Sequence, residues 1–262
     1  MEILVCVRRV PDTSENEIEL NAEGNDIERD ELVYSVNEPD NYAVEEALQI
    51  RDRVGGKVTV VTVGGEEDEE VLRRQLAMGA NEAVLLSDDA FLGSDGRGVA
   101  TILKGFVQKG HYDLILTGVQ AEDGASQIGG MLAAMLDYPF ASLVNSVVVE
   151  NGKLRVSREV EGGNREINEI ELPCVLSIQT GINEPRYVGM RGIRQVASVA
   201  IPTFGSADIG VEPATAGERG SKVRRLDYFV PMLGKGAEML HGSREENAAK
   251  VLELVATKGG LK

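Results

Sequence analysis

The chain has 262 residues, of which 42% are hydrophobic, so one large domain can bury a full apolar core without disulfide bonds. Its 27 basic and 43 acidic residues give a formal net charge of −16, which disfavours nucleic acid and anionic membrane surfaces as partners. His111 and His241 lie far apart in the sequence, and this pattern indicates neither a histidine metal site nor a catalytic triad.

The cysteines and the first residues bear on where the protein works. Cys6 and Cys174 lie in apolar runs without C-x-x-C spacing, which is typical of free thiols in a reducing compartment. The opening MEILVCVRRV has the pattern of a strand and not of a signal peptide, and no apolar run reaches roughly 18 residues. We therefore expect a cytoplasmic protein without membrane insertion.

Residues 1–145 alternate between strand and helix patterns. Buried strands are predicted, in chain order, at 2–7, 57–63, 82–86 and 112–117. Amphipathic helices are predicted at 43–54 and 66–78, and then around the apolar stripes at 99–107 and 128–136. Gly79 is expected to end the second helix. Between the first strand and the first helix, residues 11–36 resemble a hairpin excursion around NAEGND.

This alternation predicts an α/β fold with a doubly wound, mostly parallel sheet of flavodoxin-like or Rossmann-like type. If the strand order is 3-2-1-4-5, the first and fourth strands are neighbours where the order reverses. Ligands of open α/β sheets bind outside the carboxyl ends of strands at that position. The sequence therefore predicts a ligand site between the ends of these two strands.

The pattern changes after about residue 145. Residues 144–160 form two alternating runs around Asn151-Gly152, a hairpin signal, and 172–180 resemble another buried strand. Residues 182–198 show no clear period, and 200–240 are expected to form an extended arm. A terminal helix is predicted with Ser243 as N-cap, Glu246 completing a capping box, and an apolar face of Ala248, Val251, Leu252 and Val255.

The segment GVQAEDGASQIGG, residues 118–130, follows the fourth strand and can face 6–9 and the start of the first helix near Asn37. Its glycines allow close backbone approach, and Ser126 adds a hydroxyl group, which suits an anion at a helix N-terminus. Glu122 and Asp123 do not suit a phosphate and fit caps, ribose hydroxyls or a metal better. A glycine-rich N-cap also needs no ligand, and neither a Walker motif nor G-x-G-x-x-G follows the first strand. Arg8 and Arg9 are placed either to meet a phosphate or to lie in solvent.

Five segments then point to a known family: VNEPDNYAVEEAL (36–48), LAMGANEAVLL (76–86), DLILTGVQAEDGASQIGGMLAAML (113–136), SREVEGG (157–163) and INEPRYVGMRGIRQ (182–195). Together, and in this order over nearly the whole chain, they resemble the β subunit of electron transfer flavoproteins. DDAFLGSDG (88–96), RGIRQ (191–195), SADIG (206–210) and KVRR (222–225) look most similar to the branch that serves trimethylamine dehydrogenase-like partners.

The resemblance implies an adenine-nucleotide-binding sheet that holds a structural AMP, and a heterodimer with an α subunit that holds most of the redox FAD. The family's nucleotide contacts carry over to Cys6, Asn37, Glu38, Pro39, Asp40, Val63, Gln120, Ala121, Glu122, Asp123, Gly124, Ala125, Ser126, Gln127, Ile128, Gly129 and Gly130. It implies an electron carrier and not an enzyme, and no residue is assigned a catalytic role. Residues 1–200 would form the nucleotide-binding domain, and 201–262 an arm and helix packing on the α subunit.

The resemblance also assigns residues to partners. It places Met190, Arg191, Arg194 and Tyr187 in a loop, 183–195, that docks acyl-CoA or amine-type dehydrogenases, and Glu159 and Arg186 at the subunit interface. Glu159 otherwise fits a hairpin ion pair, and Arg186 a structural role in its own loop. Electrons would pass on to a membrane quinone oxidoreductase or a similar acceptor.

Two alternatives stay open. In the electron-bifurcating branch, a second FAD replaces AMP, and GSDGRGVAT (93–101) partly resembles a motif of that branch. Against it, the loop DGASQIG is one residue shorter than that branch's counterpart. A stand-alone ATP-binding module of the same architecture is the third possibility, although it would have no use for the hairpin, the docking loop and the arm.

Overall fold

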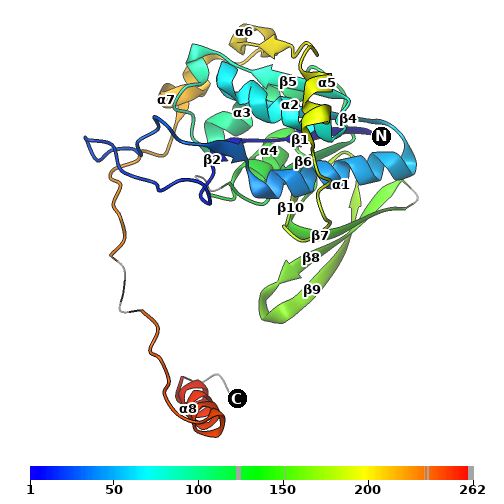
Figure 1. Cartoon of the computed structure of the whole chain (residues 1–262). Coiled ribbons are helices and arrows are strands. Elements are labelled where there is room, and N and C mark those ends of the chain that lie inside the picture. The colour runs from blue at the N-terminus through cyan, green and yellow to red at the C-terminus, as the bar shows by residue number, and fades with distance from the viewer. Residues whose placement is uncertain (122–124, 151, 233, 235, 259–262) are drawn as a thin grey trace.

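The computed structural model describes residues 1–121, 125–150, 152–232, 234 and 236–258 (Figure 1). Within them, nine strands form one sheet in the order β11-β5-β4-β1-β6-β10-β7-β8-β9. The parallel part of the sheet consists of β1 (Glu2–Cys6), β4 (Lys57–Val63), β5 (Glu82–Leu86), β6 (Leu114–Gly118), β10 (Cys174–Ile178) and β11 (Thr203–Phe204). The expected fold class, a doubly wound and mostly parallel α/β sheet, is confirmed.

The order β5-β4-β1-β6 is the predicted 3-2-1-4 arrangement, so β1 and β6 are neighbours where the order reverses. The strands at 57–63 and 82–86 have the predicted bounds, whereas β1 ends at Cys6 and β6 is shifted to 114–118. Each β1 side chain from Ile3 to Val5 is completely buried, because helices cover both faces.

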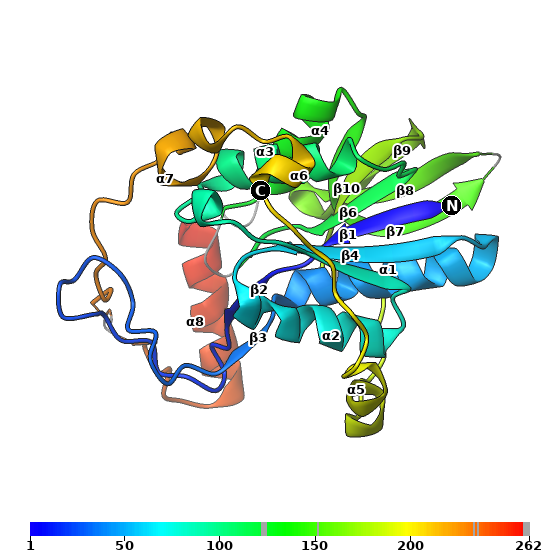
Figure 2. The same ribbon diagram turned by 90° about the horizontal axis from the view of Figure 1, so that it is seen from above.

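Helices lie on both sides of the sheet (Figure 2). The helices are α1 (Glu38–Val54), α2 (Glu69–Met78), α3 (Gly96–Val107), α4 (Ile128–Leu136), α5 (Met190–Val196), α6 (Ser206–Ile209), α7 (Gly217–Gly220) and α8 (Arg244–Thr257). Short 3-10 turns lie at η1 (Glu66–Asp68), η2 (Asp89–Phe91), η3 (Glu161–Gly163) and η4 (Pro213–Thr215). In the described residues, every helix is too short or too polar to cross a lipid bilayer.

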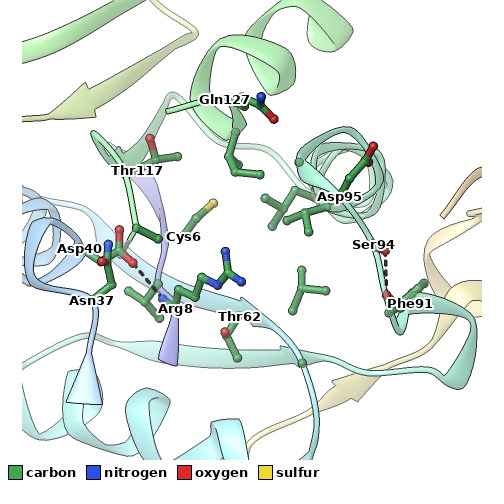
Figure 3. Close-up of a pocket in the computed structure, with 18 of the residues that line it drawn as sticks. Cys6, Arg8, Asn37, Asp40, Thr62, Phe91, Ser94, Asp95, Thr117 and Gln127 are labelled. Atoms are coloured by element: carbon green, nitrogen blue, oxygen red, sulfur yellow. Dashed lines mark hydrogen bonds between the residues drawn. The ribbon is translucent and has the colours of Figure 1, made fainter. Parts of the chain in front are cut away.

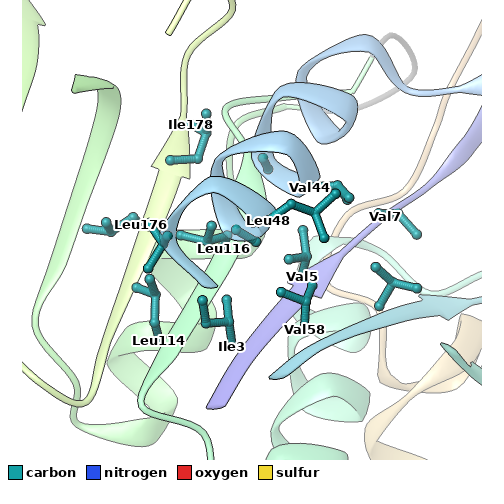
Figure 4. Packing of buried hydrophobic residues seen from close by; sticks show 14 of the residues in the cluster. Ile3, Val5, Val7, Val44, Leu48, Val58, Leu114, Leu116, Leu176 and Ile178 are labelled. Carbon is teal, nitrogen blue, oxygen red and sulfur yellow. The ribbon is translucent and has the colours of Figure 1, made fainter. Parts of the chain in front are cut away.

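Two apolar layers hold the sheet between the helices. Under α1, the side chains of Val44 and Leu48 pack on Ile3, Val5 and Leu116 (Figure 4). On the other face, the predicted stripes of α3 and α4 meet a second layer of strand side chains. Each fully buried Leu or Ile contributes about 1.5–3 kcal/mol to stability, so these layers fix where the strands end.

The first helix begins at Glu38, five residues before the predicted start at Ala43. Pro39 occupies its first turn, and Glu38 and Asp40 lie near its positive end, both of which favour a helix start. The apolar period begins only at Ala43, so the periodicity misses this first turn. This turn matters because it brings Asp40 and the preceding Asn37 to the edge of the sheet where β1 ends.

An antiparallel ribbon extends the sheet beyond β10. It consists of β7 (Phe140–Glu150), β8 (Lys153–Val160) and β9 (Asn164–Glu171). β7 runs parallel to β10 at its start and antiparallel to β8 afterwards, with a bulge near Asn145. The hairpin β7–β8 is as predicted, although Asn151 of its turn lies outside the described residues. β9 is not in the prediction, because its sequence NREINEIE is nearly all polar, as suits a largely exposed edge strand.

The excursion between β1 and α1 is a hairpin, as expected. β2 (Arg9–Pro11) pairs with β3 (Tyr34–Val36), and Leu20 bridges Ile27 near its tip. The guanidinium of Arg9 lies 3.6 Å from the centroid of the Tyr34 ring, within cation–π range. Arg9 is therefore bound to the hairpin, whereas Arg8 extends towards the space beyond β1 (Figure 3).

Residues 203–220, assigned to the arm from sequence, pack on the domain. β11 pairs with β5, and the side chains of Ile209, Val211 and Ala216 are buried in the layer under α3. The prolines and glycines of this stretch interrupt any helix or strand periodicity, so the sequence pattern does not predict these contacts. The described residues from 221 to 232 contain no helix or strand. The helix α8 has the predicted Ser243–Glu246 capping box and no buried side chain among its described residues.

Candidate functional site

A cavity of about 460 Å³ opens at the carboxyl ends of β1, β4 and β6, where the strand order reverses (Figure 3). This volume lies within the range of small-molecule sites, and the position is the one that doubly wound sheets use for ligands. The first turn of α1 and the loops that precede α3 and α4 complete its lining. A cavity therefore lies where the sequence predicts a ligand site, and ligand binding in it stays a prediction.

Asp40 joins the ends of the two central strands. Its side chain is buried, and it accepts hydrogen bonds from the backbone N–H groups of Arg8 and Gly118, both at 2.9 Å. Burial raises the pKa of Asp40 to about 7, although these N–H donors act in the opposite direction. Asp40 thus holds the end of β1 against the end of β6 and forms one wall of the cavity.

Asn37 carries an unfilled hydrogen-bonding position. It is 1% exposed, and its Nδ2 donates to the carbonyl of Gln120 at 2.8 Å, which ties the start of α1 to the loop after β6. Its Oδ1 has no hydrogen-bond partner among the described residues, yet the residue lines the cavity. A buried acceptor of this kind is stabilised when a donor reaches it, and a ligand amine or hydroxyl group supplies one.

Close packing at two glycines shapes the cavity. At Gly118, a side chain would collide with Asp40 and with Cβ of Pro39, the latter at 2.8 Å. At Gly129, a side chain would collide with Ser177 and would lie 2.9 Å from Oγ1 of Thr117. The hydroxyl groups of Thr117 and Ser177 are themselves hydrogen-bonded at 2.8 Å. Gly118 is therefore required where the end of β6 meets α1, and Gly129 where α4 packs on the sheet, independently of any ligand.

The N-terminal ends of α3 and α4 both border the cavity. Gly96 of α3 and the residues Ile128 and Gly129 of α4 line it. Asp95 is the N-cap of α3, with Oδ1 accepting from the backbone N–H of Gly98 at 2.8 Å. The two positive helix ends and their backbone N–H groups favour an anion in the space between them.

Cys6 lies at the floor of the cavity. Burial, followed by the nearby charge of Asp40, raises the pKa of the Cys6 thiol far above its ordinary range. Burial also raises the pKa of Cys174 to about 12. Both thiols are therefore protonated at neutral pH and serve as small apolar groups, since the thiolate is the reactive form.

Most residues predicted to hold a cofactor come together here. Those that line the cavity are Cys6, Asn37, Asp40, Val63, Gln120, Ala121, Ala125, Ser126, Gln127, Ile128 and Gly129. Glu38, Pro39 and Gly130 are adjacent to this lining but outside it. Glu122, Asp123 and Gly124 lie outside the described residues. Whether any of them contacts a cofactor stays a prediction.

One side of the cavity is formed by residues that are not among the predicted site residues. Residues 87–89 and 91–96 line it, together with Thr62 and Arg225. This loop follows β5, whose carboxyl end lies at the same edge of the sheet. The strand order alone could therefore have predicted that the loop borders the cavity. Arg225 has no such signal, because it comes from a segment without strand or helix pattern.

The predicted docking residues lie on another face. Tyr187 is 93% exposed and Met190 is 67% exposed, and Arg191 and Arg194 are exposed on α5. Arg186 does not extend outwards with them: it forms an ion pair with Glu45 of α1, with Nε and Oε2 at 2.8 Å. A large apolar side chain held in solvent is typical of an anchor for a partner protein.

Two contacts fix this face to the domain. The side chain of Arg73 on α2 donates to three backbone carbonyls at the end of α5, those of Val196, Ala197 and Val199, at 3.1–3.2 Å. Asn183 donates to the carbonyl of Tyr42 on α1 at 3.1 Å. The segment 183–199 is thus a supported surface, although the periodicity did not predict a helix in it.

Glu159 lies on the ribbon, away from the docking residues. It is exposed on β8, opposite Arg165 of β9. This register permits the hairpin ion pair that the sequence suggests and leaves the carboxylate accessible to another chain. Its assignment to the subunit interface stays a prediction.

Comparison with known proteins gives consistent results. Residues 25–209 match the electron transfer flavoprotein domain. The electron transfer flavoprotein subunit beta of Methylophilus methylotrophus is 37% identical over 260 residues, which cover 97% of this chain and 98% of that protein. The caffeyl-CoA reductase-Etf complex subunit CarD of Acetobacterium woodii is 36% identical over 252 residues, 95% of each chain. Protein FixA of Azotobacter vinelandii is 32% identical over 262 residues, which cover 95% of this chain and 92% of that protein.

Proposed function

Because the chain belongs to the electron transfer flavoprotein family as a β subunit, we propose that it binds AMP in the cavity at the ends of β1 and β6. With the nucleotide bound, it pairs with an α subunit and forms one wall of that subunit's FAD site. It is an electron carrier subunit, and none of its residues is given a role as acid, base or nucleophile.

The buried acceptor of Asn37 is the observation that carries the nucleotide proposal. Asn37 lines a ligand-sized cavity that the N-terminal ends of α3 and α4 also border. An adenylate has both groups that this arrangement needs, hydrogen-bond donors for the acceptor and a phosphate for the helix ends. AMP would be structural, because the thiol of Cys6 is held protonated and Asp40 is engaged by backbone donors.

The flavin supplies the redox chemistry when it is bound, and this chain contributes position and shape. The ribbon β7–β9, with Glu159, is the surface that we assign to the α subunit. Tyr187 and Met190, with Arg191 and Arg194 beside them, form the surface that docks donor dehydrogenases of acyl-CoA or amine type. The two arginines suit an acidic donor surface in a chain of net charge −16. Electrons would leave the flavin for a membrane quinone oxidoreductase or a similar acceptor in the cytoplasm.

A second FAD in the cavity is the alternative, and one observation favours it. The loop 93–96, part of the segment that resembles the bifurcating branch, lines the same cavity as the loop after β6. One relative carries the name of a subunit of a caffeyl-CoA reductase-Etf complex, so the family includes chains that assemble with an enzyme.

Counting nucleotides separates these possibilities. The chain is co-purified with its α subunit, and the nucleotides released by acid are identified and quantified. We expect one FAD and one AMP per heterodimer. Two FAD and no AMP would establish the bifurcating alternative. A stable lone chain that hydrolyses ATP, or a complex without any adenine nucleotide, would overturn the proposal.

A further inference from the structure

The chain leaves the folded domain at the cavity, and Asp95 holds it there. Oδ2 of Asp95 accepts from the backbone N–H groups of Lys222 at 2.6 Å and Val223 at 3.1 Å, while Oδ1 caps α3 through Gly98. Burial opposes ionisation, but these donors together hold the pKa of Asp95 below its ordinary value. One carboxylate therefore fixes both the helix that borders the cavity and the beginning of the extended segment.

Further hydrogen bonds join the same two segments. The backbone N–H of Gly217 donates to Oγ of Ser94 at 2.8 Å, and Oγ of Ser221 donates to the carbonyl of Gly93 at 2.9 Å. The residues from 217 to 223 are thus attached along the loop 93–95. This attachment determines where the next residues lie.

Arg225 follows this attachment by two residues and lines the cavity. Beyond it, the side chains of Leu226, Phe229 and Met232 are 87%, 76% and 97% exposed. Arg225 lies within 5.8 Å of the Tyr228 ring, and its charge also acts on Asp26 of the excursion. A residue of the extended segment therefore lines a cavity whose other lining residues lie 96 to 219 positions earlier in the chain.

The charges around this opening favour an anion. Four aspartates line the cavity, including Asp89. Three of them, Asp40, Asp88 and Asp95, each accept backbone N–H groups of their own chain. Arg8 extends into the space from the end of β1, and the positive ends of α3 and α4 face it. The groups at this cavity that can attract an anion, in a chain of net charge −16, are therefore Arg8, Arg225 and the two helix N-termini.

We propose that Arg225 binds the phosphate of the adenine nucleotide in this cavity, so that the extended segment contributes a residue to the nucleotide site. This inference rests on the proposed function. The planar guanidinium forms paired, charge-assisted hydrogen bonds with phosphate oxygens, which Lys reproduces only in charge. By linkage, a nucleotide held by Arg225 also holds the start of the segment that leads to α8.

The test uses the purified heterodimer, stripped of nucleotide by mild denaturation and refolded. Titration with AMP and with adenosine compares the wild type with Arg225→Gln, Arg225→Lys and the control Arg224→Gln. Arg224 is an exposed neighbour of the same charge that does not line the cavity. We expect Arg225→Gln to weaken AMP about tenfold to a hundredfold while leaving adenosine unchanged. Arg225→Lys should lose less AMP affinity than Arg225→Gln, and Arg224→Gln should bind AMP as tightly as the wild type.

The comparison separates the two proposals. AMP affinity in Arg225→Gln equal to that of Arg224→Gln would overturn the inference and leave the proposed function intact. An equal loss for AMP and adenosine would also overturn it, because adenosine has no phosphate. A wild-type complex that binds neither compound would contradict the proposed function itself.

Discussion

Arg186 binds Glu45 through two branches of its guanidinium: Nε lies 2.8 Å from Oε2, and Nη2 lies 3.0 Å from Oε1. The backbone N–H of Arg186 donates to the same carboxylate at 3.1 Å. The two residues are 141 positions apart in the sequence, so the pair attaches the segment before α5 to the middle of α1. Burial tends to raise the pKa of Glu45. The hydrogen bonds and charge of Arg186 outweigh this effect and keep the pKa below its ordinary value.

Replacing Glu45 should loosen the segment that presents Tyr187 and Met190. We expect Glu45→Gln to cost about 1–3 kcal/mol of stability, since it removes the ionic partner of Arg186 at a buried position. Trypsin should then cleave the segment faster at its arginines. The control is Asp52→Asn, because Asp52 is half exposed and lies 3.6 Å from Arg186, a contact worth less than about 1 kcal/mol. Equal cleavage rates in both variants would show that Glu45 does not hold the segment.

Asp40 should make stability depend on pH. Its folded pKa of about 7 lies above its ordinary value of 3.8, so the folded state binds the proton more tightly than the unfolded state. Stability should therefore fall as the pH rises from about 4 to about 7, by on the order of 2–4 kcal/mol from this group. Thermal unfolding across this range should show a shallower slope for Asp40→Asn than for the wild type, whatever the absolute cost of the substitution. Parallel profiles would contradict the raised pKa.

Gly129 and Gly130 should respond differently to the same substitution. Gly129→Ala places a methyl group against Thr117 and Ser177, and we expect a loss of about 1–3 kcal/mol together with lower nucleotide occupancy. Gly130→Ala meets only the Phe140 ring, at 3.5 Å, and should be neutral or stabilising by up to about 1 kcal/mol. Thermal unfolding of the complex and the amount of nucleotide released by acid provide the two measurements. Equal changes in thermal stability and in released nucleotide for both variants would show that contact with the sheet does not require a glycine at position 129.

Replacing Met190 should weaken docking of the donor dehydrogenase without changing the stability of the fold. Truncation to Ala removes an exposed apolar side chain, so we expect unchanged thermal stability and a KM for the donor dehydrogenase raised roughly tenfold, with kcat maintained. Val33→Ala is the matched control, since Val33 is 52% exposed on the excursion. An unchanged KM in Met190→Ala would show that Met190 is not part of the docking surface.

Much of the central sheet could be predicted because its strands are short, continuous apolar runs that only burial explains. The strands at 57–63 and 82–86 have the predicted bounds, and the order of the first four determines the edge at which the cavity opens. The contact of Asn37 with Gln120 follows from the same reasoning, since both adjoin the position where the order reverses.

What could not be predicted depends on contacts between distant segments. β9 has almost no apolar side chains, because only one of its faces touches the rest of the protein at a few positions. The helix α5 is stabilised by Arg73, which lies more than 120 positions earlier. Arg225 reaches the cavity only because Asp95 holds the residues just before it. Periodicity within a short window contains none of these relationships.

The continuity of β7 has a mechanical consequence. The same strand pairs with β10 inside the domain and with β8 outside it, so one continuous backbone joins the centre of the sheet to the ribbon, with a bulge near Asn145 between the two pairings. Because the ribbon continues the sheet and is not joined to it by a loop, we expect the ribbon to move together with the domain. If the proposed partner binds the ribbon, we expect it to keep its position relative to the cavity at the ends of β1 and β6.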